Sequence, residues 1–158
     1  MPIPRLSPDG VLPVGRYVAT VADVEAAFVD AFPTSGRRRA CFEGWQRLRQ
    51  AVLVLIPVSS QWVDGSFVTA KLDPSDLDLT TLFDGRAYDG LPDIKRKALD
   101  GLLAGHACQA VWGCDSFPIA IYPEGHVFRA KYEALYRFWE KWWSRTAGGL
   151  PKGFVEVQ

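Results

Sequence analysis

Cysteine and histidine are scarce in this chain, and their scarcity excludes two classes of small protein. The three cysteines, Cys41, Cys108 and Cys114, form neither a CxxC motif nor a metal knuckle. Because their number is also odd, we expect reduced, mostly buried thiols in a cytoplasmic protein rather than a disulfide framework. The two histidines, His106 and His126, are isolated and have no matching ligand set, so a zinc site is not expected.

The chain also lacks net charge and long apolar runs. Lysine plus arginine number 18, as do aspartate plus glutamate, so the formal net charge is zero and predicts no general attraction to nucleic acid or anionic lipid. The longest apolar run, residues 51–56, is far shorter than the roughly 20 residues that span a bilayer. Residues 1–10 lack the basic start and apolar core of a signal peptide. We therefore expect no membrane association.

What the chain has in quantity is core-forming material. Of its 158 residues, 48% are apolar and 13% are aromatic, which is enough for one hydrophobic core and argues against disorder. The length fits a single domain over residues 1–158, and the proline-rich start over residues 1–13 is expected to be an irregular arm.

Periodicity and turn residues predict alternating helices and strands. Thr20 and Asp23 form a capping signal for a helix that ends before Pro33, and Asp93 is expected to cap another. Residues 84–92 are turn-rich, and Gly113 is a candidate interruption of a strand. The other predicted helices cover residues 37–55, 93–104 and 131–145, and the predicted strands cover residues 61–68, 77–79, 110–122 and 154–157. The pattern predicts an α/β or α+β fold whose sheet carries helices mainly on one face.

The chemically informative segment spans residues 62–79. An apolar strand is expected to lead into Gly65 and Ser66, where a glycine lets a phosphate approach the backbone and a serine adds a hydroxyl donor. After an intervening loop come Asp76 and Asp78, separated by one apolar residue. On a strand, residues two apart face the same way, so the two carboxylates are expected to point together while Leu77 and Leu79 face the core.

Two neighbouring carboxylates repel each other when both are ionised, unless they are exposed or a cation lies between them. Magnesium favours one or two carboxylates together with substrate phosphates. The arrangement therefore suits phosphoryl or nucleotidyl transfer, in which the metal neutralises a triphosphate that the Gly-Ser turn holds for in-line attack.

This order of residues is similar to the signature of the polymerase-beta-like nucleotidyltransferase superfamily. The resemblance implies a minimal nucleotidyltransferase fold with a small mixed sheet, a triphosphate bound at Gly65 and Ser66, and two divalent ions, Mg²⁺ or Mn²⁺, bound at Asp76 and Asp78. The wider chain resembles a small bacterial nucleotidyltransferase-like family in its residues 62–69 and 151–156.

The superfamily also implies a third carboxylate on a later strand, which binds the catalytic metal and helps to deprotonate the attacking hydroxyl. Asp115 is the best candidate, because its neighbours are apolar and read as a strand. Gly113 and Pro118 count against it. If Asp115 does not converge on the acidic pair, we expect an impaired or inactive protein.

Several neighbouring residues allow two interpretations. Thr69 and Lys71 lie in the loop before the acids and are candidate phosphate ligands, although a solvated lysine fits equally well. Asp64 would face away from Gly65 on a strand, which favours a structural role. The basic cluster at residues 37–39 is either a solvated face or a surface for an acidic partner or nucleic acid. The aromatic helix at 131–145 favours core packing, with an exposed face for a partner or for base stacking as the alternative.

Two functions of different kinds follow. The first is an enzyme that moves a nucleoside monophosphate from a triphosphate such as ATP to a protein, RNA or small-molecule acceptor, by analogy within a toxin–antitoxin or defence pair. The second is a non-catalytic nucleotidyltransferase-like interaction protein, an antitoxin or regulatory subunit. A third interpretation, a purely structural domain, predicts no metal dependence. The third carboxylate distinguishes the first two.

Overall fold

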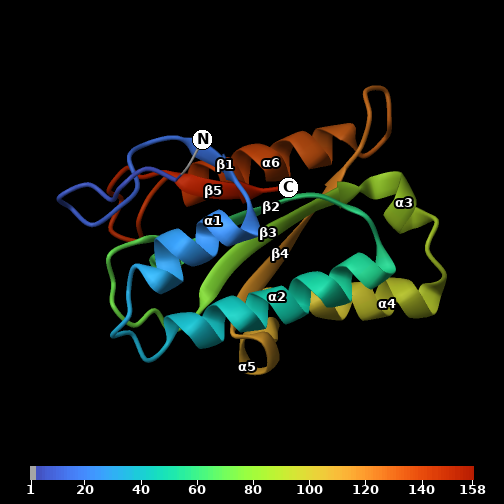
Figure 1. Ribbon diagram of the computed structural model, residues 1–158. Helices are drawn as coiled ribbons and strands as arrows, with labels where there is room; N and C mark the ends of the chain where they lie inside the picture. The colour runs from blue at the N-terminus through green and yellow to red at the C-terminus, as the bar shows by residue number, and fades with distance from the viewer. Residues whose placement is uncertain (1–2) are drawn as a thin grey trace.

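A mixed five-stranded sheet forms the centre of the computed structural model, which describes residues 3–158 (Figure 1). The strands are β1 (Arg16–Ala19), β2 (Val58–Asp64), β3 (Leu77–Asp84), β4 (Cys114–Ile121) and β5 (Phe154–Val157). Their order is β1-β5-β2-β3-β4, with β1 parallel to β5, β3 parallel to β4, and the other neighbours antiparallel. The α+β class and the mixed sheet confirm the expected fold class.

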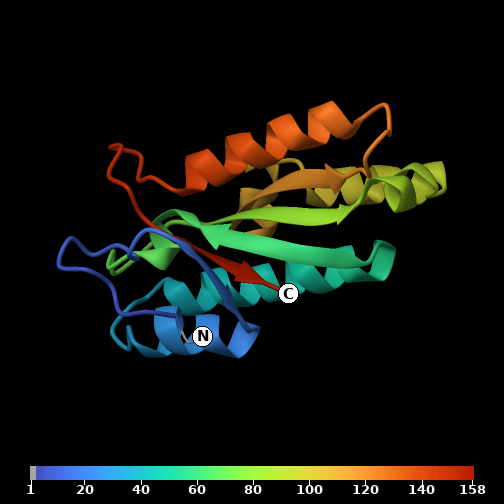
Figure 2. The ribbon, with the colours of Figure 1, turned by 90° about the horizontal axis from the view of Figure 1, so that it is seen from above.

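Helices cover the two faces of the sheet unequally, as expected. The helices are α1 (Val21–Glu25), α2 (Arg38–Leu55), α3 (Gly85–Asp89), α4 (Asp93–Leu102), α5 (Gln109–Trp112) and α6 (Arg129–Trp143). Shorter turns are η1 (Ala26–Asp30), η2 (Gly65–Val68) and η3 (His106–Cys108). Helices α1 and α2 lie on one face with α4 beside α2, whereas α6 crosses the opposite face (Figures 1 and 2).

The apolar alternation along each strand supplies one core on each face. On the larger side, Trp45 and Leu48 of α2 pack over Val63, Leu77 and Leu79, and all five side chains are fully buried. The expectation that Leu77 and Leu79 face the core is thus confirmed. Because adjacent strand residues point to opposite faces, the residues between them are turned towards α6.

The α6 face carries a smaller, aromatic core. Trp62 of β2 meets Tyr136 of α6 edge to face with ring centroids 4.8 Å apart. Trp143 of α6 donates its indole N–H to the Thr80 hydroxyl on β3 at 2.7 Å. Ile119 of β4 is fully buried in the same cluster. This core fixes α6 over the middle strands and so determines which side of the sheet stays open.

Helix starts were predicted with mixed success. Thr20 caps α1 as expected, because its hydroxyl accepts from the Asp23 backbone while the Asp23 carboxylate accepts from the Thr20 backbone. The helical region then continues through the π-helical turn η1. Asp93 is not the cap of α4, since Pro92 occupies that position and Asp93 is the first residue of the helix. The aromatic helix begins and ends two residues earlier than the expected range 131–145.

Glycines with positive φ account for two strand boundaries that were predicted wrongly. The strand expected over residues 61–68 begins at Val58 and ends at Asp64, because Gly65 has φ of 76° and starts the 3-10 turn η2. The strand expected over residues 110–122 begins only at Cys114. Its first part is the short helix α5, which Gly113 ends with φ of 69°.

Other departures concern short or exposed elements. The turn-rich stretch 84–92 contains α3, which Asp84 caps by accepting from the Arg86 backbone at 2.9 Å. The strand expected at residues 77–79 extends to Asp84. Strand β1 was not predicted, since it has only four residues and only one of them is buried.

The N-terminal arm is irregular over its described residues but does not hang free. Val11 forms an isolated bridge with Thr69, and the Ala70 backbone N–H donates to Gly10 at 2.7 Å. The arm therefore lies against the loop that follows η2. In residues 3–158, no helix combines the length and the apolar character needed to cross a membrane.

Candidate functional site

A row of carboxylates crosses the α6 face of the sheet where three strands come together. The strand register places Asp64 of β2 beside Asp78 of β3, and Asp78 beside Asp115 of β4. Asp78 shares its face with Thr80, the hydroxyl that Trp143 contacts, because the two residues are two apart on one strand. The row therefore lies on the same face of the sheet as the aromatic core, beside the part of that face that α6 covers.

Three of the acids in this region form a compact cluster. Carboxylate oxygens of Asp76, Asp78 and Asp115 all lie within 4.8 Å of one another. The expectation that Asp76 and Asp78 share a strand was wrong, because β3 starts at Leu77 and Asp76 precedes it. The two carboxylates nevertheless point together, and Asp115 joins them as expected. Gln109 of α5 donates to Asp76 at 3.1 Å. Metal binding by this cluster stays a prediction.

Burial makes the cluster electrostatically costly. Asp115 is 2% exposed, and its Oδ1 has no hydrogen-bond partner among residues 3–158. Burial raises the pKa of Asp115, with a further contribution from Asp76. Burial, followed by the charges of Asp76 and Asp115, raises the pKa of Asp78 to about 7. A divalent cation would satisfy the unpartnered oxygen and favour the ionised form of every carboxylate that it touches, so the donor set fits Mg²⁺ or Mn²⁺.

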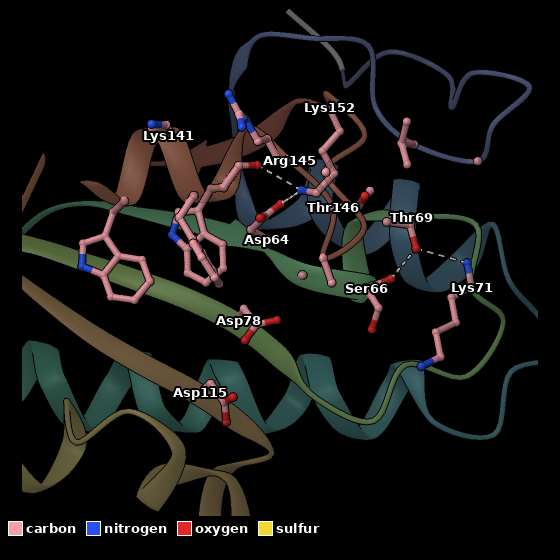
Figure 3. Close-up of a pocket in the computed structure, with 18 of the residues that line it drawn as sticks. Asp64, Ser66, Thr69, Lys71, Asp78, Asp115, Lys141, Arg145, Thr146 and Lys152 are labelled. Carbon is pink, nitrogen blue, oxygen red and sulfur yellow. Dashed lines mark hydrogen bonds and ion pairs between the residues drawn. The ribbon is translucent and has the colours of Figure 1, made fainter. Parts of the chain in front are cut away.

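Gly65 brings the backbone against the acidic row, and no other residue fits there. It has positive φ, and a Cβ built on it would lie 1.8 Å from Oδ2 of Asp78. Both the conformation and the space therefore require glycine. Ser66 follows in η2 and lines the same cavity as Asp78 (Figure 3). The predicted Gly-Ser turn thus faces Asp78, whereas Asp76 is not among the residues that line this cavity.

The loop after η2 is stabilised from within by its own polar groups. The Thr69 hydroxyl donates to the Ser66 carbonyl at 2.8 Å and accepts from the Lys71 backbone at 3.2 Å (Figure 3). Thr69 therefore shapes the turn through both of its hydroxyl contacts. The Lys71 side chain lines the cavity, so its role as a phosphate ligand stays a prediction.

Arg38 anchors this loop from the core side. Its guanidinium is fully buried and donates to the carbonyls of Phe67 at 2.6 Å, Thr69 at 2.7 Å and Lys71 at 2.5 Å. It also donates to Phe28 at 2.9 Å. The interpretation of residues 37–39 as a solvated face is therefore wrong for Arg38. The planar fork of donors, rather than a charge partner, explains why an arginine occupies this position.

Two basic residues of the site were not identified from the sequence. Nδ1 of His106 lies 2.5 Å from Oδ2 of Asp115. The chain reaches this position because Gly105, which precedes it, exchanges backbone hydrogen bonds with Ser116. An isolated histidine gives no signal of such a contact, since the pairing depends on the return of the chain after α4.

The second is Lys152, which the sequence presents as one of several scattered cations. Its ammonium contacts the Asp64 carboxylate (Figure 3). It also donates to the carbonyls of Trp143 at 3.2 Å and Gly153 at 3.3 Å. Asp64 and Lys152 are both buried, so burial raises the pKa of Asp64 while Lys152 opposes that shift. The structural role expected for Asp64 agrees with this buried ion pair.

A cavity of about 1100 Å³ joins these features. Gly65, Ser66 and Lys71 line one part of it, and Asp78 and Asp115 line its middle (Figure 3). Aromatic and basic side chains from α6 and the segment after it line another part, and residues 9–11 of the N-terminal arm also border the cavity. A concave site with convergent carboxylates of raised pKa is the expected form of a binding or catalytic centre.

Comparison with known proteins places the whole of this domain in one family. No curated protein and no solved structure matches the chain significantly. The family described as "Family of unknown function (DUF6932)" matches residues 4–158, which include every element of the sheet and every residue of the site. The chain therefore belongs to the DUF6932 family.

Proposed function

We propose that this protein is a divalent-metal-dependent nucleotidyltransferase, which moves a nucleoside monophosphate from a nucleoside triphosphate to an acceptor hydroxyl. The observation that carries the proposal is the convergence of Asp76, Asp78 and Asp115 within 4.8 Å, next to Gly65, with a buried Asp115 oxygen that has no partner among the described residues. An acidic cluster alone would be weak support. The unpartnered oxygen and the obligatory glycine are independent features that fit a cation and a phosphate.

The residues divide the work in a way that the chemistry requires. Asp76, Asp78 and Asp115 would hold Mg²⁺ or Mn²⁺, which supplies charge neutralisation at the triphosphate. The backbone at Gly65 and the Ser66 hydroxyl orient the phosphates for in-line attack. In the reaction the acceptor oxygen bonds to the α-phosphorus, the bond to the bridging oxygen breaks, and pyrophosphate leaves.

The proton of the acceptor hydroxyl needs a base close to the reacting atoms. Asp115 is the candidate for this role, because it is the third carboxylate of the cluster and its buried Oδ1 has no hydrogen-bond partner among residues 3–158. His106 contacts the other oxygen of Asp115, Oδ2, through its Nδ1. The presence of the third carboxylate in the cluster supports the catalytic proposal over a non-catalytic interaction protein. A macromolecular acceptor supplied by a partner fits a single small domain, with toxin–antitoxin pairs as an analogy only.

Calorimetry tests the proposal directly. The protein is titrated with ATP, GTP, CTP and UTP in MgCl₂ or MnCl₂, and the Asp78→Asn and Asp76→Asn variants are compared with Asp93→Asn. Asp93 is an exposed acid at the start of α4 and serves as the matched control. We expect metal-dependent binding that only the first two variants lose. Labelled triphosphates incubated with candidate protein and RNA acceptors should then release pyrophosphate. Absence of binding for all four nucleotides with either metal would refute the proposal.

A further inference from the structure

The strand register gives the cavity a direction. Strands β2 and β3 are antiparallel, so Gly65, which follows Asp64, lies on one side of the Asp64–Asp78–Asp115 row. The residues that follow Asp78 along β3 lie on the other side of that row. That next row on the same face contains Thr80 and Phe117, about 7 Å from the acids. The phosphate-binding turn, the acids and the aromatic face therefore follow one another in a line.

Some aromatic side chains at the end of this line stay exposed instead of packing in the core. Trp139 lies on Phe117 with ring centroids 4.4 Å apart and stacks on Trp143 at 5.0 Å. Phe138 and Trp142 stack on each other at 6.0 Å, yet they are 52% and 60% exposed. Phe138, Trp139 and Trp142 all line the cavity. We call these three residues the aromatic wall.

Charge distinguishes the ligand that fits this cavity from an ordinary apolar partner. Lys141 and Arg145 line the cavity near the aromatic wall, and Lys71 lines it beside the phosphate-binding turn. The carboxylates between them require a cation before any anion can approach. A ligand that complements this cavity has a polyanionic part, which binds the metal, and a flat aromatic part, which contacts the aromatic wall. A nucleotide has this form, whereas an apolar peptide would leave the carboxylates and cations unpaired.

We propose that the aromatic wall binds the base of the nucleotide by stacking, chiefly on the exposed indole of Trp142, and that it favours purines over pyrimidines. This inference rests on the proposed function, because it assigns the other end of the ligand to the metal and phosphate site. Stacking on an aromatic side chain suits every base, and the larger ring system of a purine buries more area against it. The wall thus selects the substrate class while the acids carry out the chemistry.

Inorganic tripolyphosphate separates the two claims, because it carries the phosphates without a base. Calorimetry compares tripolyphosphate, CTP and ATP, each with MgCl₂, on the wild type and on Trp142→Ala, Phe138→Ala and Trp142→Phe. Phe128→Ala is the control, since Phe128 is an exposed aromatic residue at the start of α6 outside the cavity. Melting temperatures verify that every variant folds.

We expect the wild type to bind ATP about tenfold more tightly than tripolyphosphate, with CTP between them. Trp142→Ala should weaken ATP binding about tenfold and leave tripolyphosphate unchanged, and Trp142→Phe should restore part of the loss. If neither ligand binds, the proposed function fails and the inference with it. If tripolyphosphate binds as tightly as ATP, or the wall variants leave ATP unaffected, the inference alone is overturned. It is also overturned if these variants weaken binding of an RNA oligonucleotide but not of ATP, since the wall would then serve the acceptor.

Discussion

Replacing Gly65 with alanine is the sharpest perturbation that the structure allows, because one added carbon reaches the acidic cluster directly. The new Cβ would lie 1.8 Å from Oδ2 of Asp78, whereas real Cβ contacts are essentially never shorter than 3.0 Å. The carboxylate oxygen must therefore move by at least 1.2 Å, the difference of these two values. Rotation about the Cβ–Cγ bond alone cannot relieve the clash, since Cγ of Asp78 itself lies only 2.8 Å from the same point, so the whole carboxylate must swing away.

The displacement should reduce metal and nucleotide binding strongly and the stability of the fold only moderately. Magnesium requires oxygens at about 2.0–2.1 Å in near-ideal geometry, so a ligand displaced by more than 1 Å is lost or replaced by water. A misplacement of about 1 Å costs about 100-fold in a reaction that depends on positioning. The left-handed backbone conformation adds about 1–2 kcal/mol of destabilisation for any residue with a Cβ.

Gly125→Ala is the matched control for the destabilisation that a Cβ causes in a backbone with positive φ. Gly125 also has positive φ, 78°, but a Cβ built there meets nothing within 4 Å, and the residue lies outside the cavity. Both variants should lose similar stability in urea denaturation, whereas only Gly65→Ala should lose Mn²⁺-dependent ATP binding in calorimetry and nucleotidyl transfer with an acceptor. If Gly65→Ala binds Mn²⁺ and ATP as tightly as Gly125→Ala, the assignment of Asp78 to the metal site is refuted.

Three further perturbations test the electrostatics around the site. Because the pKa of Asp78 is raised from 3.8 to about 7, the metal-free protein should lose stability as pH rises from about 4 to about 7, by about 1.4 kcal/mol per pKa unit at most. Asp78→Asn should flatten this decline in the melting temperature, and an unchanged profile would contradict the assignment. Lys152→Met should cost about 3–5 kcal/mol in urea denaturation by leaving Asp64 buried and unpaired. Adding Asp64→Asn should recover most of that loss, and failure to recover it would show that the pair is not coupled. Arg38→Met should cost about 3–5 kcal/mol by the same assay, because it leaves several buried carbonyls without donors, whereas the exposed Arg37→Met should cost little. Equal effects of these last two changes would refute the anchoring role of Arg38.

Local patterns predicted the parts of the fold that depend on neighbours in sequence. The capping box at Thr20, the apolar period of α2 and the acidic pair are contained within a few residues each, and all three are present in the structure. The starts of β4 and of η2 were missed because each depends on a glycine with positive φ, at Gly113 and Gly65. The periodicity of apolar residues does not report the sign of φ.

The parts of the site that could not be predicted are those that separate chain segments bring together. His106 meets Asp115 only because the chain returns after α4 to the edge of β4. Lys152 meets Asp64 only because β5 lies between β1 and β2. Arg38 appeared as one of three similar arginines, and its burial depends on how the loop after η2 folds over it. Spacing along the chain carries no information on such contacts.

The distribution of charge around the sheet argues that the cluster serves a ligand rather than the fold. Asp64 is neutralised by Lys152, a partner that comes from the same domain and is buried with it. Among residues 3–158, no lysine or arginine forms an ion pair with Asp78 or Asp115, and the basic side chain that contacts Asp115 is the exposed His106. Raised pKa values at both carboxylates represent free energy that folding must supply, at about 1.4 kcal/mol for each pKa unit, in a domain whose total stability is expected to be about 5–15 kcal/mol. Apolar residues at these positions would remove that cost. A bound cation would offset this cost. The free energy of unfolding, measured with and without Mn²⁺, therefore distinguishes a metal site, which Mn²⁺ stabilises, from a cluster that is only unfavourable to the fold.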